Sequence, residues 1–125
     1  MTILENFPLR DILYYKIGGK AKFVLKVQNK EDLLEALEFV KKKQIEKTLL
    51  VGLGANLLVS DNFFDGAVIL FAKPDKSSIR QLAEQNADGL VSAFASETLE
   101  DVIQFCFKNN LRGLEWASGL PSSVG

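Results

Sequence analysis

The chain has 125 residues, of which 47% are hydrophobic, with 15 basic and 16 acidic side chains and a formal net charge of -1. This composition predicts one compact domain or two small lobes rather than disorder, and the balanced charge argues against nucleic acid or an anionic membrane as the main partner. Because the chain has one cysteine and no histidine, it can form no intramolecular disulfide, no plausible zinc site and no histidine-dependent catalytic triad.

The first twenty residues carry several charged side chains, among them Arg10 and Lys16, and contain no long apolar run. Neither a secretory signal peptide nor a membrane span fits this segment. We therefore expect a cytoplasmic protein without a membrane partner.

A strand and an amphipathic helix are predicted after an N-terminal arm. Residues 21–27 read as a strand in which Phe23, Leu25 and Val27 alternate with Lys22, Val24 and Lys26. Asn29 is typical of a helix N-cap, and the acidic residues Glu31 and Asp32 follow it in the first turn. An apolar face then recurs at helical spacing, formed by Leu33, Leu34, Leu37 and Val40. The lysines at 41–43 indicate the solvated end of this helix.

Further elements follow in an order typical of an α+β or α/β fold. Strands are predicted at 48–51 and 67–71, and residues 79–85 and 90–95 flank Asn86-Ala87-Asp88-Gly89, which favours a hairpin turn. Ser96 or Thr98 would cap a second helix whose apolar face is Leu99, Val102, Ile103 and Cys106, so the cysteine reads as a core residue. Asn109-Asn110 would close that helix in the left-handed conformation.

A glycine-rich loop, Val51-Gly52-Leu53-Gly54-Ala55-Asn56-Leu57-Leu58-Val59-Ser60-Asp61, follows the strand at 48–51. Glycine permits positive φ and close backbone approach, so the N–H groups of such a loop can cradle a diphosphate. A Rossmann fingerprint would need a third glycine and an immediate helix, and a P-loop would need Gly-Lys-Ser/Thr, but neither is present. The alternative interpretation is a tight connection between strands.

The last segment, 113–125, is small, apolar and rich in glycine, with no charge after Glu115. Natural termini are usually polar and frayed. We therefore expect the sequence to be a fragment of a longer one.

Three glycine-containing motifs occur in order: Tyr15-Lys16-Ile17-Gly18-Gly19, the loop at 52–61, and Gly113-Leu114-Glu115-Trp116-Ala117-Ser118-Gly119-Leu120-Pro121. With Asn6-Phe7-Pro8-Leu9 near the start, they resemble the N-terminal, FAD-binding part of the UDP-N-acetylenolpyruvoylglucosamine reductase (MurB) family over essentially the whole chain. The resemblance implies the α+β flavoprotein fold shared with vanillyl-alcohol oxidases, in truncated form. Residues 1–74 would form a first FAD-binding lobe and residues 75–125 an incomplete second one.

The same resemblance implies which segments approach FAD. The diphosphate would lie against Gly18, Gly19, Gly52, Gly54, Ala55, Asn56 and Leu57. The flavin side would pack against Gly119, Leu120, Pro121, Ser122, Ser123, Val124 and Gly125. Backbone N–H donors suit a diphosphate, and an asparagine amide can bond both backbone and ligand.

In the family, NADPH reduces FAD, and the flavin then passes hydride to the enolpyruvyl double bond of UDP-N-acetylglucosamine enolpyruvate in peptidoglycan synthesis. No residue of this chain matches the family's catalytic groups. We therefore assign no catalytic residue, and we expect the chain alone not to turn over.

The chain departs from the family pattern at three positions. Ala55 replaces a usual serine, which removes one hydroxyl donor to phosphate, and Phe94 and Ser122 stand where the family usually has glycine. These side chains favour two alternatives. One is a flavin-free α/β interaction module or degenerate remnant, whose apolar tail docks the missing C-terminal portion or a second copy. The other is a lobe of another FAD-linked oxidase.

Overall fold

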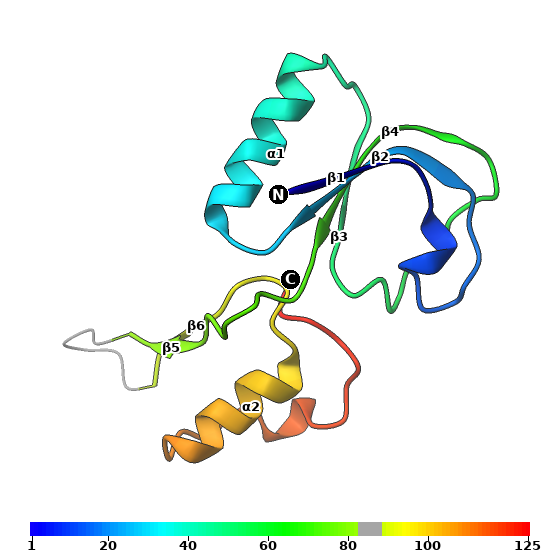
Figure 1. Ribbon diagram of the computed structural model, residues 1–125. Helices are drawn as coiled ribbons and strands as arrows, with labels where there is room; N and C mark the ends of the chain where they lie inside the picture. Colours follow the sequence, from blue (N-terminus) through cyan, green and yellow to red (C-terminus); the bar gives the residue numbers. More distant parts are fainter. Residues whose placement is uncertain (83–88) are drawn as a thin grey trace. The chain divides into compact units, whose positions relative to one another are not determined.

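The computed structural model describes residues 1–82 and 89–125, which form two compact units, Met1–Ala72 and Lys73–Gly125. Unit 1 contains a sheet and helix α1, and unit 2 contains a short hairpin and helix α2 (Figure 1). That the two units are FAD-binding lobes stays a prediction.

Unit 1 is built on a four-stranded sheet of order β1-β2-β4-β3, formed by β1 (Thr2–Pro8), β2 (Lys20–Val27), β3 (Thr48–Val51) and β4 (Phe64–Phe71). β1 is antiparallel to β2, whereas β2 and β3 are both parallel to β4. The strands predicted at 21–27, 48–51 and 67–71 are confirmed. The prediction of an N-terminal arm without a strand is wrong, because residues 2–8 form an edge strand of the sheet. Its polar residues and the left-handed Asn6, with φ 50°, break the expected alternation.

Both faces of this sheet are covered, so the alternation predicted for β2 is wrong at Val24, which is as fully buried as Leu25. One face packs on α1 (Lys30–Lys42) through a cluster of Leu25, Val27, Ala36, Ala67 and Ile69. The other face packs on loops through a cluster of Leu9, Leu13, Ala21, Val24, Val51, Val68 and Leu70. Continuous apolar runs such as residues 67–70 are typical of parallel strands buried on both sides.

Helix α1 begins as predicted after Asn29, whose side chain accepts the Asp32 N–H at 2.8 Å. Its predicted apolar face is partly wrong, because Leu34 and Leu37 are 52% and 47% exposed. The helix instead presents Leu33, Ala36, Phe39 and Val40 to the sheet. Ala36 is fully buried, and its small side chain lets the helix approach the sheet closely.

Unit 2 contains the antiparallel pair β5 (Arg80–Gln81) and β6 (Val91–Ser92), then α2 (Leu99–Lys108) and the 3-10 turn η2 (Glu115–Ala117). The predicted hairpin pairing is confirmed at residues 80–81 and 91–92, and the second strand is shorter than expected. Residues 83–88, which include the end of the predicted first strand and most of the predicted turn, lie outside the described residues. Thr98 is the N-cap, its side chain accepting the Asp101 N–H at 3.0 Å, and Cys106 is buried as predicted. Asn110 has the predicted left-handed conformation.

None of the helices within residues 1–82 and 89–125 has the length and apolar character needed to cross a membrane.

A buried carboxylate connects the segments of unit 2. Glu97 is 1% exposed, and its Oε1 accepts the N–H and the hydroxyl of Ser78 at 2.5 and 3.0 Å. The Ser78 hydroxyl in turn accepts the Phe94 N–H at 2.8 Å. The Glu97 backbone carbonyl accepts the Val124 N–H at 2.9 Å. One residue therefore holds three stretches of chain together.

The N-terminal ammonium of unit 1 is paired with helix α1. The Met1 nitrogen lies 2.6 Å from Asp32 Oδ1 and 3.5 Å from Glu35 Oε2. The second Asp32 oxygen accepts the Gln28 N–H at 3.0 Å. The hydrogen bond between ammonium and carboxylate raises the pKa of the Met1 amine and, together with that from Gln28, lowers the pKa of Asp32.

We predict that the stability of unit 1 falls as the pH rises above about 8. A raised amine pKa stabilises the fold fully below the unfolded value of 8.0, and this contribution is lost as the pH passes through the folded pKa. Asp32→Asn removes the shorter of the two ion pairs of the Met1 ammonium, so the urea midpoint of this variant should change less than that of the wild type between about pH 7 and about pH 9. Glu31→Gln, in the same helical turn, should keep the wild-type pH dependence. Identical profiles for the wild type and Asp32→Asn would contradict the prediction.

We predict that Glu97→Ala destabilises unit 2, because it leaves the N–H and hydroxyl of Ser78 without their acceptor. The expected loss is about 1–3 kcal/mol in the free energy of unfolding, accompanied by faster hydrogen exchange of the Phe94 amide. Glu97→Gln keeps an acceptor oxygen and should lose less. Glu100→Gln, at an exposed position of α2, is the control. If hydrogen exchange of the Phe94 amide is unchanged in Glu97→Ala, Glu97 does not hold Ser78 against Phe94 and the prediction is refuted.

Candidate functional site

The glycine-rich loop crosses one face of the unit 1 sheet (Figure 1). Because β3 and β4 are parallel neighbours, the chain after Val51 must return along the full length of the strands before β4 begins. Leu57 and Val59 of this loop pack against the core cluster of that face. Gly54 O accepts the Tyr14 N–H at 3.1 Å. The connection is therefore a packed layer of the unit.

The structure brings two of the predicted motifs together in unit 1. The Gly19 N–H donates to Ser60 O at 2.9 Å, so the Gly-Gly turn lies against the second half of the loop. A Cβ atom added to Gly19 would overlap the backbone carbonyl oxygens of Asp61 and Asn62. Gly18, with φ 136°, has the backbone conformation that glycine favours at this turn.

Gly54 is required by the fold itself. Its φ of +64° is left-handed, and an added Cβ would lie 2.8 Å from Ile12 O and 3.0 Å from Leu13 Cδ2. The close approach that this glycine permits is therefore to the chain's own backbone. This contact gives the interpretation of the loop as a tight connection between strands a physical basis. The backbone N–H groups that would suit a diphosphate are those of the next turn, at Ala55 and Asn56.

The middle of the loop carries the exposed candidate groups. Ala55 and Asn56 form a turn in which Asn56 is exposed, while Gly52, Ala55 and Leu57 are half-buried. Within the described residues, the Asn56 carboxamide makes no hydrogen bond. It is therefore available to a ligand. Contact between these residues and a diphosphate stays a prediction.

In unit 2 the C-terminal segment runs antiparallel to the segment that precedes α2. Three backbone hydrogen bonds join them at 2.9, 2.9 and 3.0 Å, from Gly125 to Ala95, from Val124 to Glu97, and from Leu99 to Ser122. Thr98 and Ser123 form an antiparallel bridge between the two segments. The tail predicted to face the flavin is thus held beside residues 95–99.

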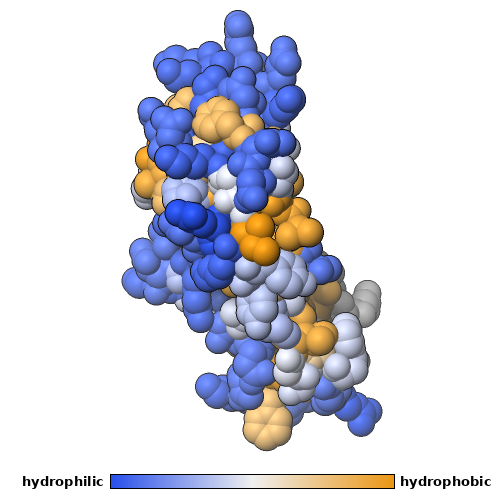
Figure 2. All heavy atoms as spheres, turned by 90° about the vertical axis from the view of Figure 1, so that its right-hand side faces the viewer, coloured by the Kyte–Doolittle hydropathy of each residue, from blue (hydrophilic) through white to orange (hydrophobic). Residues whose placement is uncertain are grey.

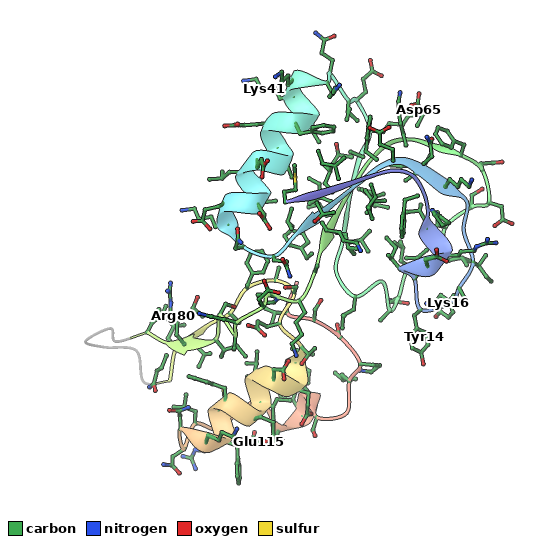
Figure 3. All side chains as sticks on the ribbon, viewed as in Figure 1. Tyr14, Lys16, Lys41, Asp65, Arg80 and Glu115 are labelled. Carbon is green, nitrogen blue, oxygen red and sulfur yellow. The ribbon has the colours of Figure 1, made fainter. Side chains whose placement is uncertain are left out.

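The glycines of the third motif differ from those of unit 1. Gly113 and Gly119 have φ of +116° and +81°, and an added Cβ would meet no atom within 4 Å at either position. Leu120 and Pro121, which follow, are exposed. The Glu115 carboxylate, labelled in Figure 3, accepts the Gly113 N–H at 2.8 and 3.0 Å. Hydrogen bonds from its own N–H and from that of Gly113 lower the pKa of Glu115.

Ser96 is a position that the sequence reasoning considered only as a helix cap. It is 2% exposed, and its hydroxyl is the one buried side-chain polar atom of the described residues without a hydrogen-bond partner. A buried hydroxyl left unpaired costs about 1–3 kcal/mol, so a ligand atom or a water is its expected partner. In the sequence Ser96 stands between Ala95 and Glu97, whose backbone carbonyls accept hydrogen bonds from the tail.

A cleft of about 420 Å³ opens beside the Gly-Gly turn of unit 1. It is lined by Pro8, Arg10, Gly18, Gly19, Lys20, Asp61 and Phe63. The sequence reasoning missed it because the N-terminal segment was predicted as an arm. The pairing of Pro8 with Lys20 in the β1–β2 ladder is what brings these residues to one place.

No family model matches the chain. It is 37% identical to the UDP-N-acetylenolpyruvoylglucosamine reductase of Caldicellulosiruptor saccharolyticus, over 100% of this chain and 38% of that protein. It is 37% identical to the enzyme of that name from Desulforamulus reducens, over 99% of this chain and 39% of that protein. For Treponema denticola the identity is 36%, over 99% of this chain and 38% of that protein.

The chain thus spans little more than a third of the length of the curated relatives it matches. The resemblance predicted from the three glycine motifs is confirmed along the whole chain. The whole chain thus corresponds to one portion of the UDP-N-acetylenolpyruvoylglucosamine reductases (MurB) that it matches.

Proposed function

We propose that this chain is the FAD-binding portion of a UDP-N-acetylenolpyruvoylglucosamine reductase, an oxidoreductase of peptidoglycan synthesis that uses NADPH. The observation that carries the proposal is the similarity of the whole chain to enzymes of that name, at 37% identity in two of them. The predicted cofactor segments also gather within each unit, the Gly-Gly turn with the loop in unit 1 and the tail with residues 95–99 in unit 2.

The groups present fit a diphosphate and a flavin. In unit 1, the turn at Ala55 and Asn56 offers an exposed carboxamide and backbone N–H donors, which suit phosphate oxygens. In unit 2, the backbone at Gly119 leaves open space in the third motif, and the buried hydroxyl of Ser96, in the segment that bonds the tail, lacks a hydrogen-bond partner. FAD supplies the hydride chemistry when bound, and the residues of this chain bind and orient it.

The chemical step is expected to need groups outside this chain. The carboxylates of Glu97 and Glu115 already accept hydrogen bonds from this chain's own backbone. We therefore assign neither of them to proton transfer. The remaining portion of the relatives is the expected partner that completes the substrate and NADPH sites.

We predict that the folded chain binds FAD saturably, as measured by quenching of flavin fluorescence. Asn56→Asp places a carboxylate beside the diphosphate and should weaken binding at least about tenfold. Gln44→Glu makes the same change at an exposed position after α1 and should bind FAD as the wild type does. Gly54→Asp is a poor probe, because its Cβ would collide with Ile12.

Two results would refute this proposal: no FAD binding by a sample shown to be folded, or equal affinities for Asn56→Asp and Gln44→Glu. The first of them would favour the flavin-free interaction module.

We predict that Ala55→Ser tightens FAD binding about fivefold, because one added hydroxyl donor to phosphate is worth about 1 kcal/mol. The same titration measures the change. Ala55→Gly, which adds no donor, should not tighten binding. A serine variant that binds like the wild type would show that position 55 does not face the diphosphate.

A further inference from the structure

We propose that a cleft at the end of helix α1 binds a small organic phosphate, with Lys43 and Lys47 on the phosphate and Phe23 and Ile45 against its apolar part. The cleft lies in unit 1 and has a volume of about 490 Å³. It is lined by Lys22 and Phe23 of β2, by residues 43–47 between α1 and β3, and by Asp65 and Gly66 of β4. None of these residues belongs to the segments predicted to approach FAD.

An irregularity of the sheet forms one wall of this cleft. The register of β2 against β4 shifts by one residue between Ala21 and Phe23, because β4 has one residue more over this stretch. Such a β-bulge interrupts the ladder and re-aims the side chains beside it. Lys22, the residue between them, forms an ion pair with Asp65 of the bulged segment, with Nζ and Oδ1 2.8 Å apart. Charged side chains therefore gather at this wall.

Backbone contacts fix the opposite wall. The Ala67 N–H donates to Lys47 O at 2.9 Å. A Cβ atom added to Gly66 would lie 2.5 Å from the same oxygen, so glycine is what lets the two segments approach this closely. The volume of the cleft is within the range of small-molecule pockets. Because the fold itself holds the walls, the cleft is preformed, which lowers the entropic cost of binding.

The last turn of α1 does not oppose an anion in this cleft. Carbonyl oxygens without donors at a helix C-terminus carry a negative partial charge that would disfavour one. Here the carbonyls of residues 39–41 accept the N–H groups of Lys43, Gln44 and Ile45 at distances between 2.9 and 3.1 Å. Lys43 is also the C-cap of the helix, so a positive side chain stands where the helix ends.

The charges of the cleft favour an anion. Lys22 is already paired with Asp65, but within the described part of the chain the ammonium groups of Lys43 and Lys47 make no hydrogen bond and no ion pair. The Lys22 hydrogen bond and the charges of Lys22 and Lys47 lower the pKa of Asp65, so both lysines act on one carboxylate. The other carboxylate of the lining is Glu46. Two ammonium groups without an acidic partner match a phosphate monoester, because lysine binds phosphate as a compact point charge.

The apolar side chains of the cleft favour an organic group next to that phosphate. Phe23 and Ile45 are half-buried, since each packs on the core cluster beneath α1 and also lines the cleft. The Phe23 ring meets the Phe39 ring edge to face, with centroids 5.3 Å apart, which holds it in place. This end of unit 1, uppermost in Figure 1 and Figure 2, otherwise shows a largely hydrophilic surface. A bare phosphate would leave the two apolar side chains in water, whereas an ester can cover them.

The test is a titration of the whole chain with phenyl phosphate, which joins an aromatic ring to a phosphate, followed through amide chemical shifts. Saturable shifts are expected at residues 43–47 and at Gly66. The double variant Lys43→Gln/Lys47→Gln should bind phenyl phosphate at least about tenfold more weakly than the wild type, because both ammonium groups are lost.

The matched control is Lys30→Gln/Lys108→Gln, which removes the same charge at exposed positions outside the cleft and should bind phenyl phosphate as the wild type does. Glu46→Gln removes a negative charge from the lining and should tighten binding at least about twofold. Inorganic phosphate lacks the apolar part and benzoate carries one negative charge. Each should bind at least about fivefold more weakly than phenyl phosphate.

The proposal is overturned if phenyl phosphate does not bind saturably, if the two double variants bind it equally, or if benzoate or inorganic phosphate binds as tightly. Shifts confined to residues 52–57 would place the phosphate on the glycine-rich loop and would also overturn it. A parallel FAD titration of Lys43→Gln/Lys47→Gln separates this proposal from the proposed function. Unchanged FAD affinity is expected, whereas a loss would make the cleft part of the cofactor site and overturn the inference.

Discussion

The parallel pairing of β3 with β4 is the constraint on which the loop side of unit 1 depends. Parallel neighbours need a connection that returns the full length of the strand, and most proteins use a helix for it. Here residues 52–63 make the return without one, so the loop has to cover the sheet with its own side chains. Leu57 and Val59 do so, and close backbone contacts of Gly19 and Gly54 hold the layer together.

This constraint changes how the glycine motifs are interpreted. In unit 1, the space that a Cβ would occupy at Gly19 and Gly54 is already taken by the chain itself. In unit 2, the space beside Gly119 is open, and the nearby segment contains a buried hydroxyl without a partner. The same residue type therefore has two physical roles. The glycines of unit 1 are explained by packing of the chain on itself, whereas the open space at Gly119 leaves room for a ligand.

Local signals in the sequence predicted most elements, because capping and periodicity act over a few residues. Asn29 and Thr98 cap their helices through the side-chain bonds that their positions indicated. The predictions that were wrong concern features that depend on contacts between distant segments. Val24 is buried because a loop far along the chain covers its face, and β1 is a strand because β2 pairs with it. The Glu97 carboxylate gave no signal, because a glutamate just before a helix usually remains solvated.

The ion-paired N-terminus has a consequence for how this protein is handled. An affinity tag or an acetyl group at Met1 would convert a cation into a neutral amide facing the carboxylates of Asp32 and Glu35. Both acids would lose their counter-charge at the first turns of α1, the helix that covers one whole face of the sheet. Fusion at the other end of the chain leaves this arrangement intact.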